Sequence, residues 1–413
     1  MKRNRKTRQR IWIVCVAVLL AGHGDGTSAA ANDEVNVKAK ELAQEYILID
    51  THQDVPYRLT KQVEDISKRT EHGDFDYPRA RAGGLDAVFM AVYVPAEYEE
   101  EGGAYTFANE TIDMVEGFAS AWPDKFVMAT SIADISQQFG AGRISLAMGI
   151  ENGAPIEGNL ANLKHFFDRG VRYITLVHSK NNHICDSSFD EERKWHGLSP
   201  FGVEVVREMN RLGMIVDVSH VSDETFYQIM DVSKAPVVAT HSACRFFTPG
   251  CERNMDDQMI KLLAKKGGVM QINFGSMFVN AQVYREFVER RKRIKEYVDA
   301  HNLKGEARQK YGEQYAKDHP LSEADISDVV ANIDHVVQLV GIDYVGLGSD
   351  FDGVGDSLPK GLKDVSCYPN LIHELLRKGY AQDDIRKICS GNFLRVWSQV
   401  ERTARELQSG SGF

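Results

Sequence analysis

The chain has 413 residues, 43% of them hydrophobic and 26% charged, which is the composition of an ordinary globular protein with room for a large core. Its 59 Asp or Glu against 49 Lys or Arg give a formal net charge of −10, and this acidic balance disfavours a nucleic-acid partner. The basic cluster at residues 290–295 does not reverse that conclusion, because Glu286, Glu289 and Glu296 interleave with it at the spacing of a solvated helix face.

Residues 1–31 have the pattern of a secretory signal peptide. Six Lys or Arg fall within the first ten residues, residues 11–21 are almost wholly apolar, and Ser-Ala-Ala-Ala at residues 28–31 is suited to cleavage. The apolar run is too short for a comfortable membrane span. Removing residues 1–31 takes away six basic residues and Asp25, so the mature chain, residues 32–413, has 43 basic and 58 acidic residues and a net charge of −15. We expect a secreted or periplasmic protein, or a membrane-anchored one if the signal is retained.

The mature chain keeps an odd number of cysteines, so at least one thiol is unpaired within a monomer. Cys244 and Cys251 could close a short loop, but no Cys-x-x-Cys spacing indicates a zinc knuckle. Buried free thiols are the prediction for Cys185, Cys244, Cys251, Cys367 and Cys389.

The first strand of the mature chain carries the first candidate metal ligands. A short amphipathic helix over residues 34–44 leads into an aliphatic run that ends in His52-x-Asp54. Side chains two apart on a strand face the same side, so an imidazole and a carboxylate converge there. Pro56 cannot donate to a sheet ladder and is expected to end the strand just past the pair.

A regular alternation of strands and helices follows a polar segment that reaches about residue 80. The strands end at ligand-type side chains in five cases, and a short run at 125–130 is expected to be peripheral. The expected strands are 86–94, 144–150 before Glu151, 172–177 before His178, 214–219 before His220, 236–240 before His241, 268–274, and 344–349 before Asp350. The expected helices are 105–122, 159–168, 201–212, one capped by Ser222, 256–266, and a charged helical stretch over 280–340 with Ser322 and Asp325 as a capping box.

Eight apolar strands alternating with helices predict an α/β fold, a closed (β/α)8 TIM-like barrel formed by residues 32–413 as a single domain. The segment 280–330 is then a helical insertion before the last strand, placed to act as a lid or an interface. Chemistry in such barrels gathers at the C-terminal ends of the strands, which is where the ligand-type residues lie.

One histidine at a strand end is usually structural, but the joint pattern favours a metal centre. Two divalent cations need imidazole ligands, a terminal carboxylate and a carboxylate able to bridge them. The sequence offers His220 and His241 as separate histidines, His52 with Asp54 as a pair, and Glu151 as the bridge. Zinc is favoured, and manganese, iron or cobalt could bind the same set. Two further candidate site residues could instead have a structural role. Arg253 could form a surface ion pair, and Asp350 could cap a helix.

The chain resembles the membrane dipeptidase (renal dipeptidase) family of zinc metallopeptidases, which are amidohydrolase-like barrels. The resemblance runs from about residue 45 to 400, and two departures stand out. Thr51-His-Gln-Asp-Val replaces the more usual Gly-His-Asn-Asp-Leu, and the loop after His178 lacks the Asn-Thr-Pro-Trp of mammalian members. The matching segments are Asp50-Thr-His-Gln-Asp-Val-Pro56, Gly149-Ile-Glu-Asn-Gly153, Tyr173-Ile-Thr-Leu-Val-His178, Asp217-Val-Ser-His-Val-Ser222, Thr240-His-Ser-Ala243, Arg253-Asn254 and Gly346-Leu-Gly-Ser-Asp-Phe-Asp-Gly353.

The resemblance implies two zinc ions, one held by His52 and Asp54 and the other by His220 and His241, with Glu151 as the bridge. It further implies that His178 approaches the substrate carbonyl, that Arg253 holds the substrate carboxylate, and that Asp350 handles protons. A homodimer is expected by analogy only.

The hypothesis from the sequence is a metal-dependent dipeptidase that uses a hydroxide bridging two zinc ions and tolerates a D-residue at the C-terminal position. Asp350 would take the proton from that water and deliver it to the leaving nitrogen, and a carboxylate clamp at Arg253 would favour very short peptides. One alternative is another amidohydrolase-like enzyme acting on a lactone, a phosphoester or a deaminase substrate. Another is a noncatalytic periplasmic receptor for a metal or solute.

Overall fold

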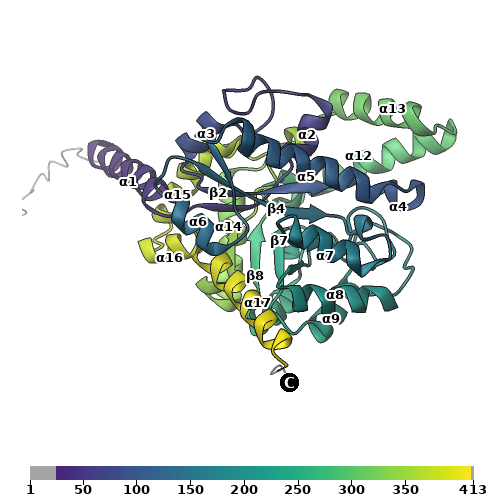
Figure 1. Ribbon diagram of the computed structural model, residues 1–413. Coiled ribbons are helices and arrows are strands. Elements are labelled where there is room, and N and C mark those ends of the chain that lie inside the picture. The colour runs from purple at the N-terminus through teal and green to yellow at the C-terminus, as the bar shows by residue number, and fades with distance from the viewer. Residues whose placement is uncertain (1–24, 411–413) are drawn as a thin grey trace, which may run out of the picture.

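The computed structural model describes residues 25–410, which fold around a nearly closed parallel β-barrel (Figure 1). The barrel strands follow the order β1-β2-β4-β5-β6-β7-β8-β9, and β3 lies off this path, where it pairs with the start of β4. The predicted TIM-like barrel of eight strands and the peripheral place of the run at 125–130 are therefore confirmed. The strands are β1 (Ile49–Gln53), β2 (Ala87–Tyr93), β3 (Phe126–Met128), β4 (Ile144–Glu151), β5 (Val171–Thr175), β6 (Ile215–Asp217), β7 (Val238–Ser242), β8 (Val269–Ile272) and β9 (Val345–Leu347).

Helices cover the outside of the barrel, so most strand residues are buried on both faces (Figure 1). This burial is why strands such as β2 and β4 are almost continuously apolar. The helices are α1 (Asp25–Glu45), α2 (Val55–Lys61), α3 (Tyr77–Gly83), α4 (Tyr98–Glu101), α5 (Ala104–Ala121), α6 (Ile132–Gln138), α7 (Leu160–Asp168), α8 (Pro200–Leu212), α9 (Asp223–Val232), α10 (Asp257–Lys265), α11 (Ser276–Val279), α12 (Ala281–Ala300), α13 (Gly305–Asp318), α14 (Ile326–Val340), α15 (Tyr368–Arg377), α16 (Gln382–Arg386) and α17 (Asn392–Gln408).

The N-terminal end of the barrel is filled by apolar side chains and closed by the last helix, α17. Phe89 of β2 packs edge-on against Phe393 and Trp397 of α17, with ring centroids 5.3 and 5.6 Å away. All three rings belong to one buried cluster that also takes in Ile49 and Tyr173. Because this end is sealed, the polar residues of the barrel are directed to the opposite, C-terminal mouth.

Buried aspartates hold together the two seams where strand pairing is thinnest. Between β9 and β1 the backbone makes only the isolated bridge Gln53↔Phe351, and β6 pairs with β7 through a single register pair. Asp50 accepts hydrogen bonds from the backbone N–H groups of His52 and Ser349, and so ties β1 to the loop after β9. Asp217 does the same between β6 and β7, as described below.

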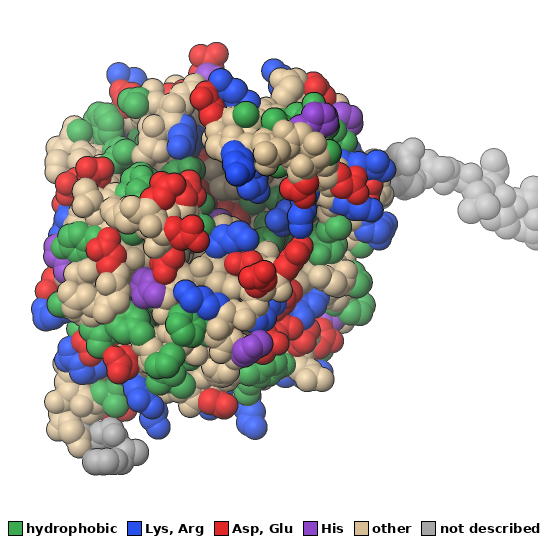
Figure 2. All heavy atoms as spheres, turned by 90° about the vertical axis from the view of Figure 1, so that its right-hand side faces the viewer, with side chains coloured by type: hydrophobic (Ala, Val, Ile, Leu, Met, Phe, Trp, Pro, Cys, Tyr) green, Lys and Arg blue, Asp and Glu red, His purple; other side chains and the backbone are tan. Residues whose placement is uncertain are grey.

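The predicted helical insertion before the last strand is the hairpin of α12 and α13, which extends from the upper right of the barrel in Figure 1. Its basic cluster lies largely on the exposed surface of α12, as expected, and Figure 2 shows acidic and basic side chains interspersed on this side of the molecule. The hairpin touches the long loop after β5, because the Arg291 guanidinium lies 5.7 Å from the Phe189 ring and Lys295 lies 3.8 Å from Glu191.

Two local predictions need correction. The supposed polar segment before residue 80 contains α2 and α3, and Pro56 sits in the first turn of α2 rather than simply ending a strand. The capping box of α14 is formed by Asp325 with Asp328, not with Ser322, whose N–H and hydroxyl instead donate to Glu286. Both pairs have the N-cap-to-N3 spacing of a capping box, so the spacing did not show that the helix begins after Asp325 rather than after Ser322. Ser222 caps α9 as predicted.

The predicted signal peptide falls mainly outside the described residues, and residues 25–31 are the first part of α1. Among residues 25–410, no helix is long and apolar enough to cross a membrane. The five cysteines of this region are all free thiols, and all but the half-buried Cys367 are buried, as the sequence predicted.

Candidate metal and peptidase site

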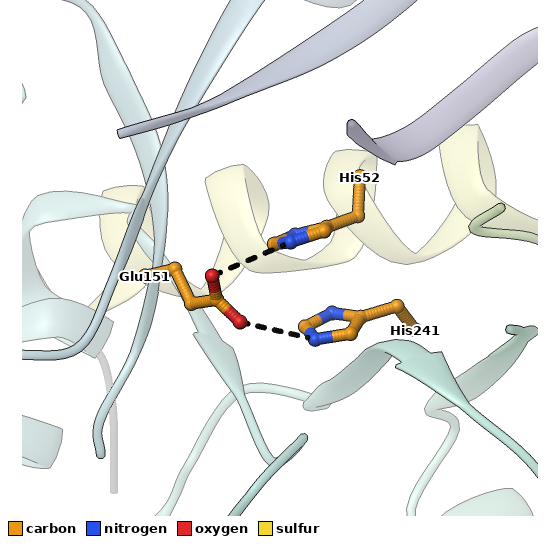
Figure 3. Close-up of side chains that lie close together, drawn as sticks. All are labelled: His52, Glu151 and His241. Atoms are coloured by element: carbon orange, nitrogen blue, oxygen red, sulfur yellow. Dashed lines mark ion pairs between the residues drawn. The ribbon is translucent and has the colours of Figure 1, made fainter. Parts of the chain in front are cut away.

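Glu151 lies at the centre of the barrel mouth, at the end of β4, with a different group of imidazoles facing each carboxylate oxygen. Oε2 is 3.6 Å from Nε2 of His52, while Oε1 is 3.1 Å from Nε2 of His220 and 3.3 Å from Nε2 of His241. Figure 3 shows the carboxylate between His52 and His241, with one oxygen turned to each ring. All four side chains are buried. His52 comes from β1, His220 from the loop after β6, and His241 from β7, so closure of the barrel brings the three rings to one mouth.

Asp54 completes the group on the His52 side of Glu151. It occupies the N-cap position of α2, yet its carboxylate makes no capping hydrogen bond. Its Oδ2 instead lies 3.5 Å from Nε2 of His52. The sequence pair His52-x-Asp54 therefore converges on one point, as its spacing predicted.

The donor atoms fit divalent cations better than they fit one another. Among the described residues, Nε2 of His52 and Oδ1 of Asp54 are buried with no hydrogen-bond partner. Nε2 of His220 and Nε2 of His241 lie only 2.9 Å apart while both face Glu151. Groups of three donor residues within metal-binding reach include His52, Glu151 and His241. Imidazole and carboxylate donors in this mixture suit zinc and neighbouring divalent metals.

Burial and mutual charge set the protonation of these groups. Burial pushes the pKa of Glu151 up, but the imidazoles of His178 and His52 and hydrogen bonds from His220 and His241 outweigh it and hold that pKa well below its ordinary value. Burial, reinforced by nearby positive groups, lowers the pKa of His220 and of His241 well below the usual range. A carboxylate beside neutral imidazoles, as at His220 and His241, is the form that binds metal.

Asp350 follows β9 and lies on the Asp54 side of the mouth. It does not cap a helix, because its Oδ2 accepts a hydrogen bond of 2.7 Å from Nδ2 of Asn273 and its backbone has a left-handed φ of 63°. Burial raises the pKa of Asp350 well above its ordinary value, and the neighbouring Asp54 adds to the effect. His220 also has a positive φ, of 70°, so both residues adopt a strained backbone conformation.

His178 and Arg253 lie at the edge of the group. His178 Nε2 is 3.7 Å from Oε1 of Glu151, and its side chain is 22% exposed, which leaves it facing the open side of the mouth. Arg253 is buried and forms no surface ion pair. Its Nη1 donates to the Ser242 hydroxyl at 2.9 Å and its Nη2 to the carbonyl of His241 at 2.7 Å, while Nε has no partner among the described residues.

Three residues of the mouth were not singled out from the sequence. Tyr93 ends β2 in register with Glu151, and its ring packs edge-on against His178 at 4.8 Å. Tyr173 hydrogen-bonds Nδ1 of His52 through its hydroxyl at 2.7 Å. Asn273 positions Asp350. Tyr93 ends β2 and Asn273 directly follows β8, so their positions at strand ends were usable signals in the sequence.

Comparison with known proteins agrees with this geometry. The model of the Membrane dipeptidase family (Peptidase family M19) matches residues 36–411. The chain belongs to this family. Dipeptidase aclJ of Aspergillus oryzae is 37% identical over 343 residues, which cover 81% of this chain and 72% of that protein.

Solved structures show the same barrel. The probable dipeptidase PvdM from Pseudomonas aeruginosa superposes with a TM-score of 0.80 at 27% identity, covering 90% of this chain and 100% of that one. A metallopeptidase from Rhodobacter sphaeroides, liganded with a phosphinate mimic of the dipeptide L-Ala-D-Ala, superposes with a TM-score of 0.71 at 23% identity, covering 86% and 99%. The protein is therefore a metallo-dipeptidase, a hydrolase, and the noncatalytic receptor considered from the sequence is set aside.

Proposed function

We propose that this dipeptidase holds two zinc ions and hydrolyses dipeptides that carry a free C-terminal carboxylate, including those with a D-residue at that end. The observation that supports two metals is the orientation of Glu151, whose oxygens face separate sets of imidazoles at 3.1 to 3.6 Å. One metal takes His52 and Asp54, the other takes His220 and His241, and Glu151 serves both.

Metal ions bound by these residues would supply a hydroxide nucleophile at neutral pH, because they lower the pKa of the water that they share toward ~7. The contribution of the chain is to hold five donor side chains in a buried mouth from which bulk water is largely excluded. Manganese, iron or cobalt could replace zinc, since the donor set does not exclude them.

Asp350 is the proton carrier in this proposal. Asn273 fixes Oδ2 by donating to it, which leaves Oδ1 to accept the proton of the attacking water and pass it to the amine nitrogen that departs. An amide does not break readily without protonation of that nitrogen, so the role is needed whatever the side chains of the substrate.

Arg253 and His178 orient the substrate. Arg253 has an unpartnered Nε and a planar fork suited to a carboxylate, so it would bind the free C-terminus and set the distance to the cleaved bond. His178, at the open edge, would donate to the carbonyl oxygen as negative charge develops on it. Because the metallopeptidase of Rhodobacter sphaeroides is liganded with an L-Ala-D-Ala mimic, that dipeptide is the first to test.

The test combines metal analysis and hydrolysis on one sample. We expect two zinc ions per chain, release of alanine from L-Ala-L-Ala and L-Ala-D-Ala, and loss of both activities on chelation with recovery on adding zinc. Binding of a single metal would refute the assignment of two sites. Hydrolysis of L-Ala-L-Ala without any cleavage of L-Ala-D-Ala would remove tolerance of the D-residue, and cleavage of a lactone in place of any dipeptide would favour the amidohydrolase-like alternative.

We further propose that residues 1–31 direct export of the chain. The basic start, the apolar run and the small residues before Asn32 support this, and a membrane-anchored form would follow if the segment is retained. N-terminal sequencing of the protein from fractionated cells tests it. A chain that starts at Met1 and stays with the cytosol would contradict export.

A further inference from the structure

Asp217, at the end of β6, has a carboxylate that four hydrogen-bond donors saturate. Its Oδ2 accepts from the hydroxyls of Thr175 at 2.5 Å and Thr240 at 2.6 Å. Its Oδ1 accepts from the backbone N–H groups of Ser219 and Thr240, both at 2.9 Å. The residue is fully buried. A carboxylate can only accept hydrogen bonds, so Asp217 is the acceptor in all four.

The direction of the Thr240 bond determines where the ring hydrogen of His241 lies. The hydroxyl of Thr240 has one hydrogen, and Asp217 takes it. The same oxygen lies 2.8 Å from Nδ1 of His241, so it can only accept there, and Nδ1 must carry the ring hydrogen. Nε2 of His241 is then a bare lone pair, and it is the atom that faces Glu151 at 3.3 Å.

His220, the other ring at this end of Glu151, has the opposite surroundings. Its Nδ1 is buried with no hydrogen-bond partner among the described residues. Its Nε2 faces two acceptors, Oε1 of Glu151 at 3.1 Å and Nε2 of His241 at 2.9 Å. Before metal binds, the ring hydrogen of His220 is therefore on Nε2, where it has a partner, because a buried N–H without an acceptor is costly.

We propose that Asp217, acting through the hydroxyl of Thr240, is a positioning residue that presets His241 as an Nε2 metal ligand, whereas His220 has to change tautomer when metal binds. That change moves one hydrogen from Nε2 to Nδ1 of the same ring, so no proton is gained or lost. The inference rests on the metal site of the proposed function, but it concerns the chain before any metal or substrate is present.

The neighbouring ligand offers a matched comparison. Thr51 precedes His52 as Thr240 precedes His241, and it is equally buried. Its hydroxyl lies within hydrogen-bonding distance only of backbone carbonyls, those of Thr240 at 2.6 Å and Leu347 at 3.1 Å, and it does not touch the imidazole. Thr51→Val removes a buried hydroxyl that contacts the backbone of Thr240, but it leaves the Thr240 hydroxyl and its bonds to Asp217 and His241 in place.

The experiment reads the ring nitrogens of the metal-free, full-length protein by ¹⁵N NMR after labelling of the histidines, with His241 assigned from the spectrum of His241→Gln. We expect an Nδ1–H ring at His241 in the wild type, in Thr240→Ser and in Thr51→Val, and a loss of that single tautomer in Thr240→Val. Competition with a chelator should show one zinc ion bound roughly 10–100-fold more weakly in Thr240→Val and unchanged in the other two variants.

An Nε2–H ring at His241 in the wild type would overturn the proposal, and this reading does not depend on whether Thr240→Val folds. Equal tautomers and equal zinc affinities in Thr240→Val and Thr51→Val would overturn it as well. An Nδ1–H ring in a protein that cleaves no dipeptide would leave the inference standing while refuting the proposed substrate, so the two failures are distinguishable.

Discussion

Replacing Asp86 with asparagine should remove a pH dependence of stability that has nothing to do with catalysis. Asp86 lies just before β2, far along the barrel from the mouth, and is only 7% exposed. Its Oδ2 accepts a hydrogen bond of 3.0 Å from the backbone N–H of Leu48, and Arg81 is 3.6 Å from Oδ1. Burial outweighs both and raises the pKa of this carboxyl from 3.8 to about 6.

The sign and size of the effect follow from that pKa. The folded protein binds this proton more tightly than the unfolded chain, so the stability that it confers is complete below pH 3.8 and is lost as the pH rises through about 6. A shift of roughly two pKa units corresponds to about 3 kcal/mol. Asparagine keeps an oxygen for the N–H of Leu48 but has no proton to lose, so the variant should gain about 2.5 kcal/mol relative to wild type between pH 4 and pH 7.

Urea unfolding of both metal-free proteins at several pH values measures this difference. Because the metals are removed beforehand by chelation, their loss in acid does not affect the comparison. The contributions of other titrating groups cancel in the difference because both proteins have them. A free-energy difference between Asp86→Asn and wild type that stays flat from pH 4 to pH 7 would refute the reasoning.

Three substitutions probe the mouth. Asp350→Asn should abolish turnover while two metals per chain remain by elemental analysis, and loss of the metals would reassign Asp350 to structure. Arg253→Ala should mainly raise KM for dipeptides with a free carboxylate, measured against amidated analogues, and an equal effect on both would remove its role as a clamp. Gly353→Ala would place a Cβ 2.2 Å from carboxylate oxygens of both Asp350 and Asp54, so kcat should fall about 100-fold while the fold persists by circular dichroism. Unchanged kcat would mean that the two carboxylates can separate without consequence.

The barrel and the ligand positions could be predicted because each depends on short-range pattern. Residues 144–150 are almost wholly apolar and Glu151 comes directly after them, so the sequence shows both a parallel strand and a rim residue. The convergence of His52, His220 and His241 then follows once these strands close into a barrel. Their roles as ligands remain proposals, and export and dimerisation remain predictions.

The partners behind the ligands could not be predicted in the same way. Asn273 reaches Asp350 across 77 positions of sequence, and Tyr173 reaches His52 across 121, through side-chain directions that strand periodicity does not specify. Asp217 stood within a recognisable segment, but only the distances to Thr240 show what its carboxylate does. The predicted capping box of α14 was wrong for a related reason. Whether Ser322 or Asp325 is the N-cap depends on where the chain turns after the α12–α13 hairpin.

The buried aromatic cluster at the N-terminal end of the barrel joins the first strand to the last helix. Ile49 stands in the first strand and Trp397 in the last helix, yet both belong to one buried cluster. The interior is therefore complete only once the segment that follows Asn392 has been synthesised. A chain cut before Asn392 would keep every candidate site residue but lose Phe393 and Trp397, which close the N-terminal end of the barrel.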